Sequence, residues 1–213
     1  MNFKNFTKHI RRQHLARFLV QVELFKLVQN VKGSVIECGV HEGGGVFAWA
    51  QLSTILQPYM YSRRVIGFDT FSGFPEVDEI DNSTVGEFNV TDYDVYSEMQ
   101  ECIKQFDDNR FLNHIPKIEL VKGDANETIP KFVNKNKHLL VSLLYLDFDI
   151  YKPTKTALEQ FLPRMSKGSI VAFDEVNNPN WAGETEALLG EFNLNEFELK
   201  SFHFEPNISY IQL

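Results

Sequence analysis

Hydrophobic residues follow two different periods along the chain, and the change between them falls near residue 33. Before that point, apolar residues recur at helical spacing over residues 3–31, which predicts one or two helices. After it, short apolar runs alternate with amphipathic stretches, which is typical of strands that alternate with helices. The predicted strands are residues 34–38, 65–68, 118–121, 139–146 and 169–173, and the predicted helices are residues 46–56, 95–106 and a segment that starts at Pro153.

This alternation predicts an α/β fold: a mostly parallel sheet with helices on both faces. The run 139–146 is apolar at every position except Ser142, as expected of a strand that is buried on both sides. Residues 198–204 and 208–213 should form an antiparallel pair around Pro206, which completes a seven-stranded sheet. Without an internal repeat or a linker, we expect residues 1–213 to form a single domain, with residues 1–32 as an N-terminal helical cap.

Composition narrows the classes of function. The formal net charge of -8 argues against binding to a nucleic-acid backbone, which requires a basic surface. No apolar run approaches the ~20 residues of a membrane span, and residues 1–12 lack the apolar segment of a signal peptide. Cys38 and Cys102 match no zinc spacing, so we expect free thiols in a reducing cytoplasm. The sequence leaves open whether the chain forms a homo-oligomer.

The N-terminal helical region is basic, whereas residues 76–94 are acidic and loop-like. The bases that precede the first acid, Glu23, are Lys4, Lys8, Arg11, Arg12 and Arg17. They could form a solvated helix face, or they could form a lid that meets an anionic ligand. In the second case, the basic region and the acidic stretch would flank the same pocket and become ordered when ligand binds.

A glycine-bearing turn follows the first predicted strand. It reads Glu37-Cys38-Gly39-Val40-His41-Glu42 and continues into Gly43-Gly44-Gly45. Glycines allow the backbone to approach a ligand closely, but the spacing is not the Gly-x-Gly-x-x-Gly of dinucleotide sites. An acid that leads into the turn suits a cationic amino-acid ligand, such as the methionine part of S-adenosylmethionine. A tight structural turn is the alternative.

Acids also stand at the ends of the later strands. Asp69 is placed to accept hydrogen bonds from two ribose hydroxyls, and Asp124 from an adenine amino group. Asp147 and Asp149 follow the strand 139–146, and the pair Asp174-Glu175 follows the strand 169–173. Carboxyl ends of parallel strands share one edge, where such acids would repel one another unless they were protonated or bound to a hard cation. Helix capping and surface ion pairs are the alternative for these acids.

These segments resemble the macrocin O-methyltransferase family, which methylates hydroxyls of antibiotic deoxysugars. The resemblance covers residues 37–213. It is carried by the glycine turn, by Phe68-Asp69-Thr70-Phe71-Ser72-Gly73-Phe74-Pro75, by Leu146-Asp147-Phe148-Asp149-Ile150-Tyr151, and by Asp174-Glu175 with Trp181-Ala182-Gly183-Glu184. It implies the class I methyltransferase (Rossmann-like) fold, S-adenosyl-L-methionine as methyl donor, and magnesium.

The resemblance also implies roles for individual residues. Asp147, Asp174 and Glu175 match metal ligands, and Asp149 matches the position of a catalytic base. The expected catalytic residues are therefore Asp149 and Asp147. Glu175 stands where related enzymes often have Asp, so the coordination can differ. The residues expected at the cofactor are Glu37, Gly39, Val40, Gly43, Asp69, Thr70, Ser72, Gly73, Asp124, Ala125 and Asp147, and His41 is a weaker candidate nearby.

The expected function is therefore methyl transfer to a hydroxyl of a small molecule, with a sugar as the favoured acceptor. Two alternatives of other classes remain. One is a nucleoside-binding module without turnover, which would gain nothing from clustered carboxylates. The other is a nicotinamide-dependent oxidoreductase, which the missing Gly-x-Gly-x-x-Gly disfavours.

Overall fold

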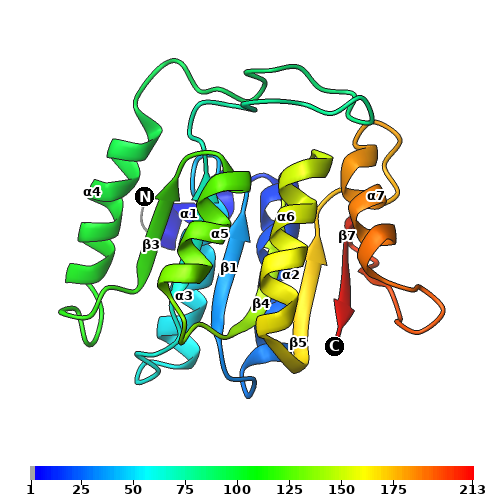
Figure 1. Ribbon diagram of the computed structural model, residues 1–213. Coiled ribbons are helices and arrows are strands. Elements are labelled where there is room, and N and C mark those ends of the chain that lie inside the picture. The colour runs from blue at the N-terminus through cyan, green and yellow to red at the C-terminus, as the bar shows by residue number, and fades with distance from the viewer. Residues whose placement is uncertain (1–2) are drawn as a thin grey trace.

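Seven strands form one sheet in the order β3-β2-β1-β4-β5-β7-β6 (Figure 1) in the computed structural model, which describes residues 3–213. Residues 1 and 2 of the predicted N-terminal cap lie outside the described residues. The strands β1 to β5 are parallel to one another, and β7 is antiparallel to both β5 and β6. The predicted α/β fold with a mostly parallel sheet is thus confirmed. The strands are β1 (Ser34–Cys38), β2 (Val65–Asp69), β3 (Ile118–Lys122), β4 (Val141–Leu146), β5 (Met165–Phe173), β6 (Lys200–Phe202) and β7 (Glu205–Gln212).

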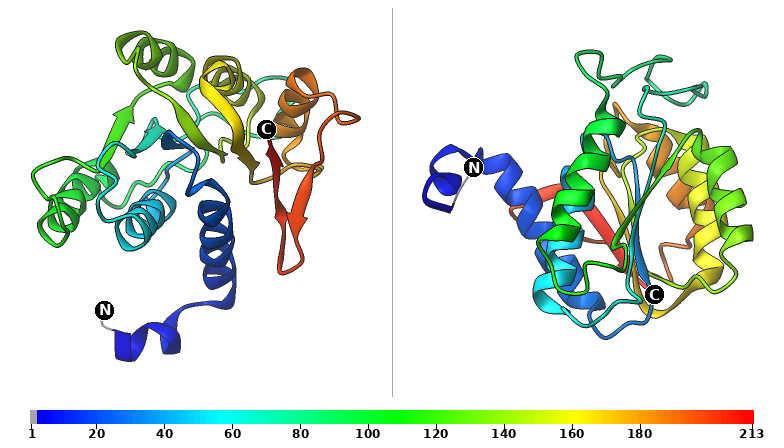
Figure 2. Two further views of the ribbon diagram at one scale, coloured as in Figure 1. Left: turned by 90° about the horizontal axis from the view of Figure 1, so that it is seen from below. Right: turned by 90° about the vertical axis from the view of Figure 1, so that its left-hand side faces the viewer.

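Helices cover both faces of the sheet (Figures 1 and 2). On one face pack α2 (Arg12–Val28), α3 (Gly44–Leu56) and α4 (Val95–Asp108), and on the other α5 (Ala125–Lys135), α6 (Tyr151–Phe161) and α7 (Ala182–Glu191). A short 3-10 helix, Leu162–Arg164, follows α6. The helix α1 (Phe3–His9) extends away from the rest of the chain (Figure 2). Within residues 3–213, no helix has the length and apolarity needed to cross a membrane.

The structure differs from the sequence prediction at three places. The helices α5 and α7 were not predicted, and α5 contains Pro130. The helix α5 still forms because Asp124 accepts a hydrogen bond from the Asn126 amide at 2.8 Å and caps its first turn. Pro206 lies inside β7 rather than between the last two strands, since Phe202 already pairs with Glu205. The register shift in this pairing accommodates a residue that cannot donate a backbone hydrogen bond.

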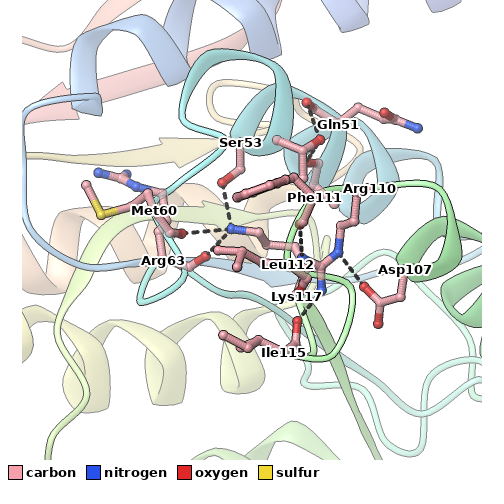
Figure 3. Close-up of polar contacts among 12 residues, drawn as sticks. Gln51, Ser53, Met60, Arg63, Asp107, Arg110, Phe111, Leu112, Ile115 and Lys117 are labelled. Atoms are coloured by element: carbon pink, nitrogen blue, oxygen red, sulfur yellow. Dashed lines mark hydrogen bonds and ion pairs between the residues drawn. The ribbon is translucent and has the colours of Figure 1, made fainter.

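Two buried cationic side chains lie at the amino ends of β2 and β3. The guanidinium of Arg63 donates to the carbonyls of Val28 and Val31, just past the end of α2, at 3.0 and 2.6 Å. The Lys117 ammonium donates to Ser53 Oγ and to the Arg63 carbonyl at 3.1 and 2.8 Å (Figure 3). Burial lowers the pKa of Lys117 to about 8. These contacts tie the helices to the amino ends of the strands. The cavity described below lies at the opposite, carboxyl ends.

Candidate active site

A cavity of about 480 Å³ lies at the carboxyl ends of the parallel strands. The long loop between β2 and α4 passes over this end of the sheet (Figure 1). In the order β3-β2-β1-β4-β5, β2 and β3 are added on one side of β1, and β4 and β5 are added on its other side. Ligands of open α/β sheets bind at the point where the strand order reverses in this way, which here lies between β1 and β4. Eleven of the predicted site residues line the cavity, and they come from the ends of all five parallel strands. They are Gly39, Asp69, Thr70, Ser72, Gly73, Asp124, Ala125, Asp147, Asp149, Asp174 and Glu175.

Asp69 holds together the turns that follow β1 and β2. Its Oδ2 accepts hydrogen bonds from the amides of Val40 and His41 at 2.7 and 2.8 Å, and its Oδ1 accepts one from the Phe71 amide at 2.6 Å. His41 and Phe71 have φ angles of 49° and 55°, in the left-handed region that side chains with a Cβ rarely adopt. The carboxylate therefore stabilises two strained turns. Its contact with a ribose stays a prediction.

The glycine turn brings its backbone close to β4 and buries Glu37. A Cβ on Gly39 would stand 1.8 Å from the Asp147 carbonyl oxygen, and one on Gly45 would stand 2.4 Å from a carboxylate oxygen of Glu37. Glu37 is 3% exposed, and burial raises its pKa to about 8. Three of the predicted cofactor residues do not line the cavity: Glu37, Val40 and Gly43. Glu37 lies buried beneath the turn, and its contact with a cofactor stays a prediction. The Val40 amide supports the turn by donating to Asp69.

Asp147 and Asp174, at the ends of β4 and β5, share one guanidinium. Arg17 of α2 lies 3.4 Å from Asp147 Oδ2 and forms an ion pair with Asp174 Oδ2. The hydroxyl of Tyr145 donates to the other oxygen of Asp174 at 2.6 Å. Arg17 and Tyr145 were not identified from the sequence. Tyr145 is part of the apolar run of β4, and Arg17 is one of several bases in a helical region, so neither carried a signal of its own.

Asp149 lines the cavity two residues beyond Asp147, in a strained conformation. Its φ angle is 62°. Burial raises its pKa to about 7, and the charges of Asp174 and Glu175 contribute to the shift. A carboxyl group with a pKa near neutrality is suited to proton transfer at physiological pH.

Glu184, in the first turn of α7, supports the loops that carry these acids. It is fully buried, and its Oε2 accepts a hydrogen bond from the Glu175 amide at 3.0 Å. Burial raises its pKa, whereas the backbone amides of Glu175 and Asp149 act in the opposite direction. The sequence analysis quoted Glu184 only as part of a family segment. The structure shows that it lies directly under the acid cluster.

The predicted metal ligands do not converge as a set of three. Asp147 and Asp174 are occupied by Arg17, and the Glu175 side chain accepts a hydrogen bond from Asn178 Nδ2 at 2.5 Å. Within residues 3–213, no group of three or more His, Cys, Asp or Glu side chains is arranged to hold a metal ion. The donor oxygens are chemically suited to a hard divalent cation, but their present arrangement does not fit one.

The loop between β2 and α4 covers the cavity with aromatic side chains. The Phe88 ring lies 5.4 Å from the Phe74 ring and 5.7 Å from the Trp181 ring, and all three residues line the cavity. Asp81 anchors the loop, because its Oδ1 accepts a hydrogen bond from the Tyr151 amide at the start of α6 at 2.9 Å. Of the described basic N-terminal residues, Arg17 reaches this cavity. Ordering of these segments by ligand stays a prediction.

Comparison with known proteins finds one family model and several relatives that are named as O-methyltransferases. The model of the family described as Macrocin-O-methyltransferase (TylF) matches residues 7–189. The crystal structure of CalS11, a calicheamicin methyltransferase, has a TM-score of 0.91 and 32% sequence identity, and the match covers 100% of this chain and 86% of that one. An apo structure of CalS11, described as a TDP-rhamnose 3'-O-methyltransferase, has a TM-score of 0.84 and 29% identity over the same shares.

A relative from Streptomyces olivaceus, 8-demethyl-8-(2,3-dimethoxy-alpha-L-rhamnosyl)-tetracenomycin-C 4'-O-methyltransferase, is 26% identical over 152 residues. The aligned segment is 70% of this chain and 55% of that relative. The chain therefore spans a little over half the length of the curated relatives it matches.

Proposed function

The chain belongs to the macrocin O-methyltransferase family, and on that basis we propose that it transfers a methyl group from S-adenosylmethionine to a hydroxyl of a sugar. The observation that carries this proposal is the convergence of Asp69, Asp147 and Asp149 on one cavity at the β1–β4 switch point. One end of this cavity offers groups suited to a nucleoside, and the other offers a carboxylate suited to removing a proton.

The cofactor is proposed to lie along the ends of β1, β2 and β3. Gly39 permits close approach of the ligand to the backbone, Asp69 faces the ribose, and Asp124 with Ala125 faces the adenine. A volume of about 480 Å³ is within the range of small-molecule sites. When bound, the sulfonium supplies an electrophilic methyl group attached to a good leaving group. The protein then has to orient the acceptor and accept its proton, and orientation alone can contribute up to ~7–11 kcal/mol.

Asp149 is the proposed base. Its carboxylate would accept the proton of the acceptor hydroxyl as the oxygen attacks the methyl carbon, so that a neutral alcohol becomes a competent nucleophile. Its pKa of about 7 leaves a large fraction ionised near neutral pH while keeping it basic enough to accept the proton. Asp147 and Asp174, fixed by Arg17 and Tyr145, border the acceptor and accept hydrogen bonds from its other hydroxyls.

The acceptor is proposed to be a sugar unit because the CalS11 and tetracenomycin relatives are named for methylating such units. Aromatic rings at the cavity mouth, those of Phe74, Phe88 and Trp181, offer flat apolar surfaces against which a sugar ring can pack. A nucleotide-linked sugar and a glycosylated natural product both satisfy this description. The experiment below includes both.

Magnesium, which the resemblance implies, enters no step of this mechanism. The side chains that would hold it are Asp147, Asp174 and Glu175, and they are occupied by Arg17, Tyr145 and Asn178. The remaining expectations stay predictions: a single domain, a homo-oligomer left open, and a cytoplasmic location, for which the free thiols of Cys38 and Cys102 give support.

Two measurements test the proposal. Isothermal titration should show binding of S-adenosylhomocysteine and no binding of NAD. A mass-shift screen with S-adenosylmethionine should add 14 Da, the mass of one CH₂ group, to nucleotide-linked deoxysugars or to glycosylated natural products. Failure of S-adenosylhomocysteine to bind would contradict the cofactor assignment, and a screen without any methylated sugar would contradict the acceptor class.

A further inference from the structure

Arg17 stands where the family resemblance would place a cation. Its guanidinium pairs with Oδ2 of Asp174 and lies 3.4 Å from Oδ2 of Asp147. The second oxygen of Asp174 is taken by Tyr145 at 2.6 Å. Arg17 is 130 residues before Asp147 in sequence and comes from α2, outside the segments that carry the resemblance.

The two carboxylates require positive charge close by. Asp147 follows the fully buried strand β4, and Asp174 follows five buried residues at the end of β5. The Asp174 side chain is 6% exposed, so bulk water screens its charge poorly. A guanidinium meets this requirement because it is always charged and can donate to two acceptors at once. A divalent cation would be held by the same two carboxylates, and its charge would repel the guanidinium at close range.

We propose that Arg17 is the counter-ion of this acid pair and competes with divalent cations for Asp147 and Asp174. Cation binding then requires the guanidinium to leave. Withdrawal needs little rearrangement, since the Arg17 side chain is 46% exposed and α2 is held by residues further along, including Val20 and Leu24. The inference takes from the proposed function only the role of this cavity as the acceptor site.

The competition can be measured without any methyl transfer. We would titrate the full chain with Mn²⁺, following binding by water-proton relaxation and by calorimetry in the absence of cofactor. Arg17→Gln should bind Mn²⁺ at least tenfold more tightly than the wild type, because both carboxylates lose their counter-ion. Arg17→Lys keeps the charge and should stay within about threefold of the wild type.

Two further variants separate competition from other effects. Arg12→Gln removes the same charge from an exposed position of the same helix, and its affinity for Mn²⁺ should match the wild type within twofold. Adding Asp174→Asn to Arg17→Gln should abolish the gain in affinity. Circular dichroism checks that every variant is folded.

Three results would overturn the inference: no gain in Arg17→Gln, an equal gain in Arg12→Gln, or a gain that survives Asp174→Asn. Arg17→Lys keeps the inference testable if Arg17→Gln does not fold, because a tenfold gain in that charged variant would also overturn it. Failure of the wild type to bind S-adenosylhomocysteine would instead contradict the proposed function and leave the cation competition standing.

Discussion

Replacing Asp69 with Asn tests whether this carboxylate stabilises the turns of the site in addition to its proposed contact with the cofactor. Its two oxygens accept three backbone hydrogen bonds, from Val40, His41 and Phe71. An amide has one acceptor oxygen, so its NH₂ group must face at least one backbone N–H donor. The amide orientation of lower energy keeps the hydrogen bonds from the Val40 and His41 amides and loses the one from the Phe71 amide. Hydrogen bonds to charged groups contribute about 1.5–3 kcal/mol, and the two remaining bonds also lose their charge. Asp69→Asn should therefore lower the free energy of unfolding by ~2–4 kcal/mol without any ligand.

Urea unfolding of the ligand-free protein measures this loss, and calorimetry measures the affinity for S-adenosylhomocysteine, which should fall more than tenfold. Asp92→Asn is the matched control, because Asp92 lies exposed on the same loop and should change neither quantity. A normal unfolding free energy with weakened cofactor binding would refute the structural role and leave Asp69 as a ligand contact only. Normal cofactor binding would refute the ribose assignment.

Three further predictions concern the remaining buried groups. Asp149→Asn should lower kcat more than 100-fold and change the affinity for S-adenosylhomocysteine less than threefold. In the wild type, kcat should rise with pH through about 7, because Asp149 loses its proton there. Glu184→Ala should lower the free energy of unfolding by about 1–3 kcal/mol, because the Glu175 amide loses its hydrogen-bond acceptor. Glu184→Gln keeps an acceptor oxygen and should lower it less. Equal losses for the two variants in urea unfolding would contradict this. Burial lowers the Lys117 pKa from 10.5 to about 8, so the unfolded state binds more protons between these pH values and stability rises with pH across that window. The difference in unfolding free energy between wild type and Lys117→Met should grow by up to ~3 kcal/mol over the window, and a flat difference would contradict the lowered pKa.

The sequence alone predicted a mostly parallel sheet and placed the site at the carboxyl ends of its strands. The run that became β4 is apolar at nearly every position because both of its faces are covered by helices, and the structure buries all six of its residues. Acids after successive strands converge because parallel strands end at one edge, so Asp69, Asp124, Asp147 and Asp174 could be assigned to one cavity from their order. The helix α5 escaped prediction because Pro130 interrupts its pattern, and its cap at Asp124 was interpreted as a ligand contact.

Only the tertiary structure decided which groups those acids meet. Arg17 lies more than a hundred residues from its partners in sequence, and nothing in its local surroundings distinguishes it from Arg11 or Arg12. Glu184 reaches the Glu175 amide because it lies in the first turn of α7, which packs against α6 and begins close to the carboxyl end of β5. The strands and helices are encoded by local patterns, whereas the partner of a charged side chain depends on how distant elements pack. For this reason the sequence predicted a cation between Asp147 and Asp174, and the fold supplied a guanidinium.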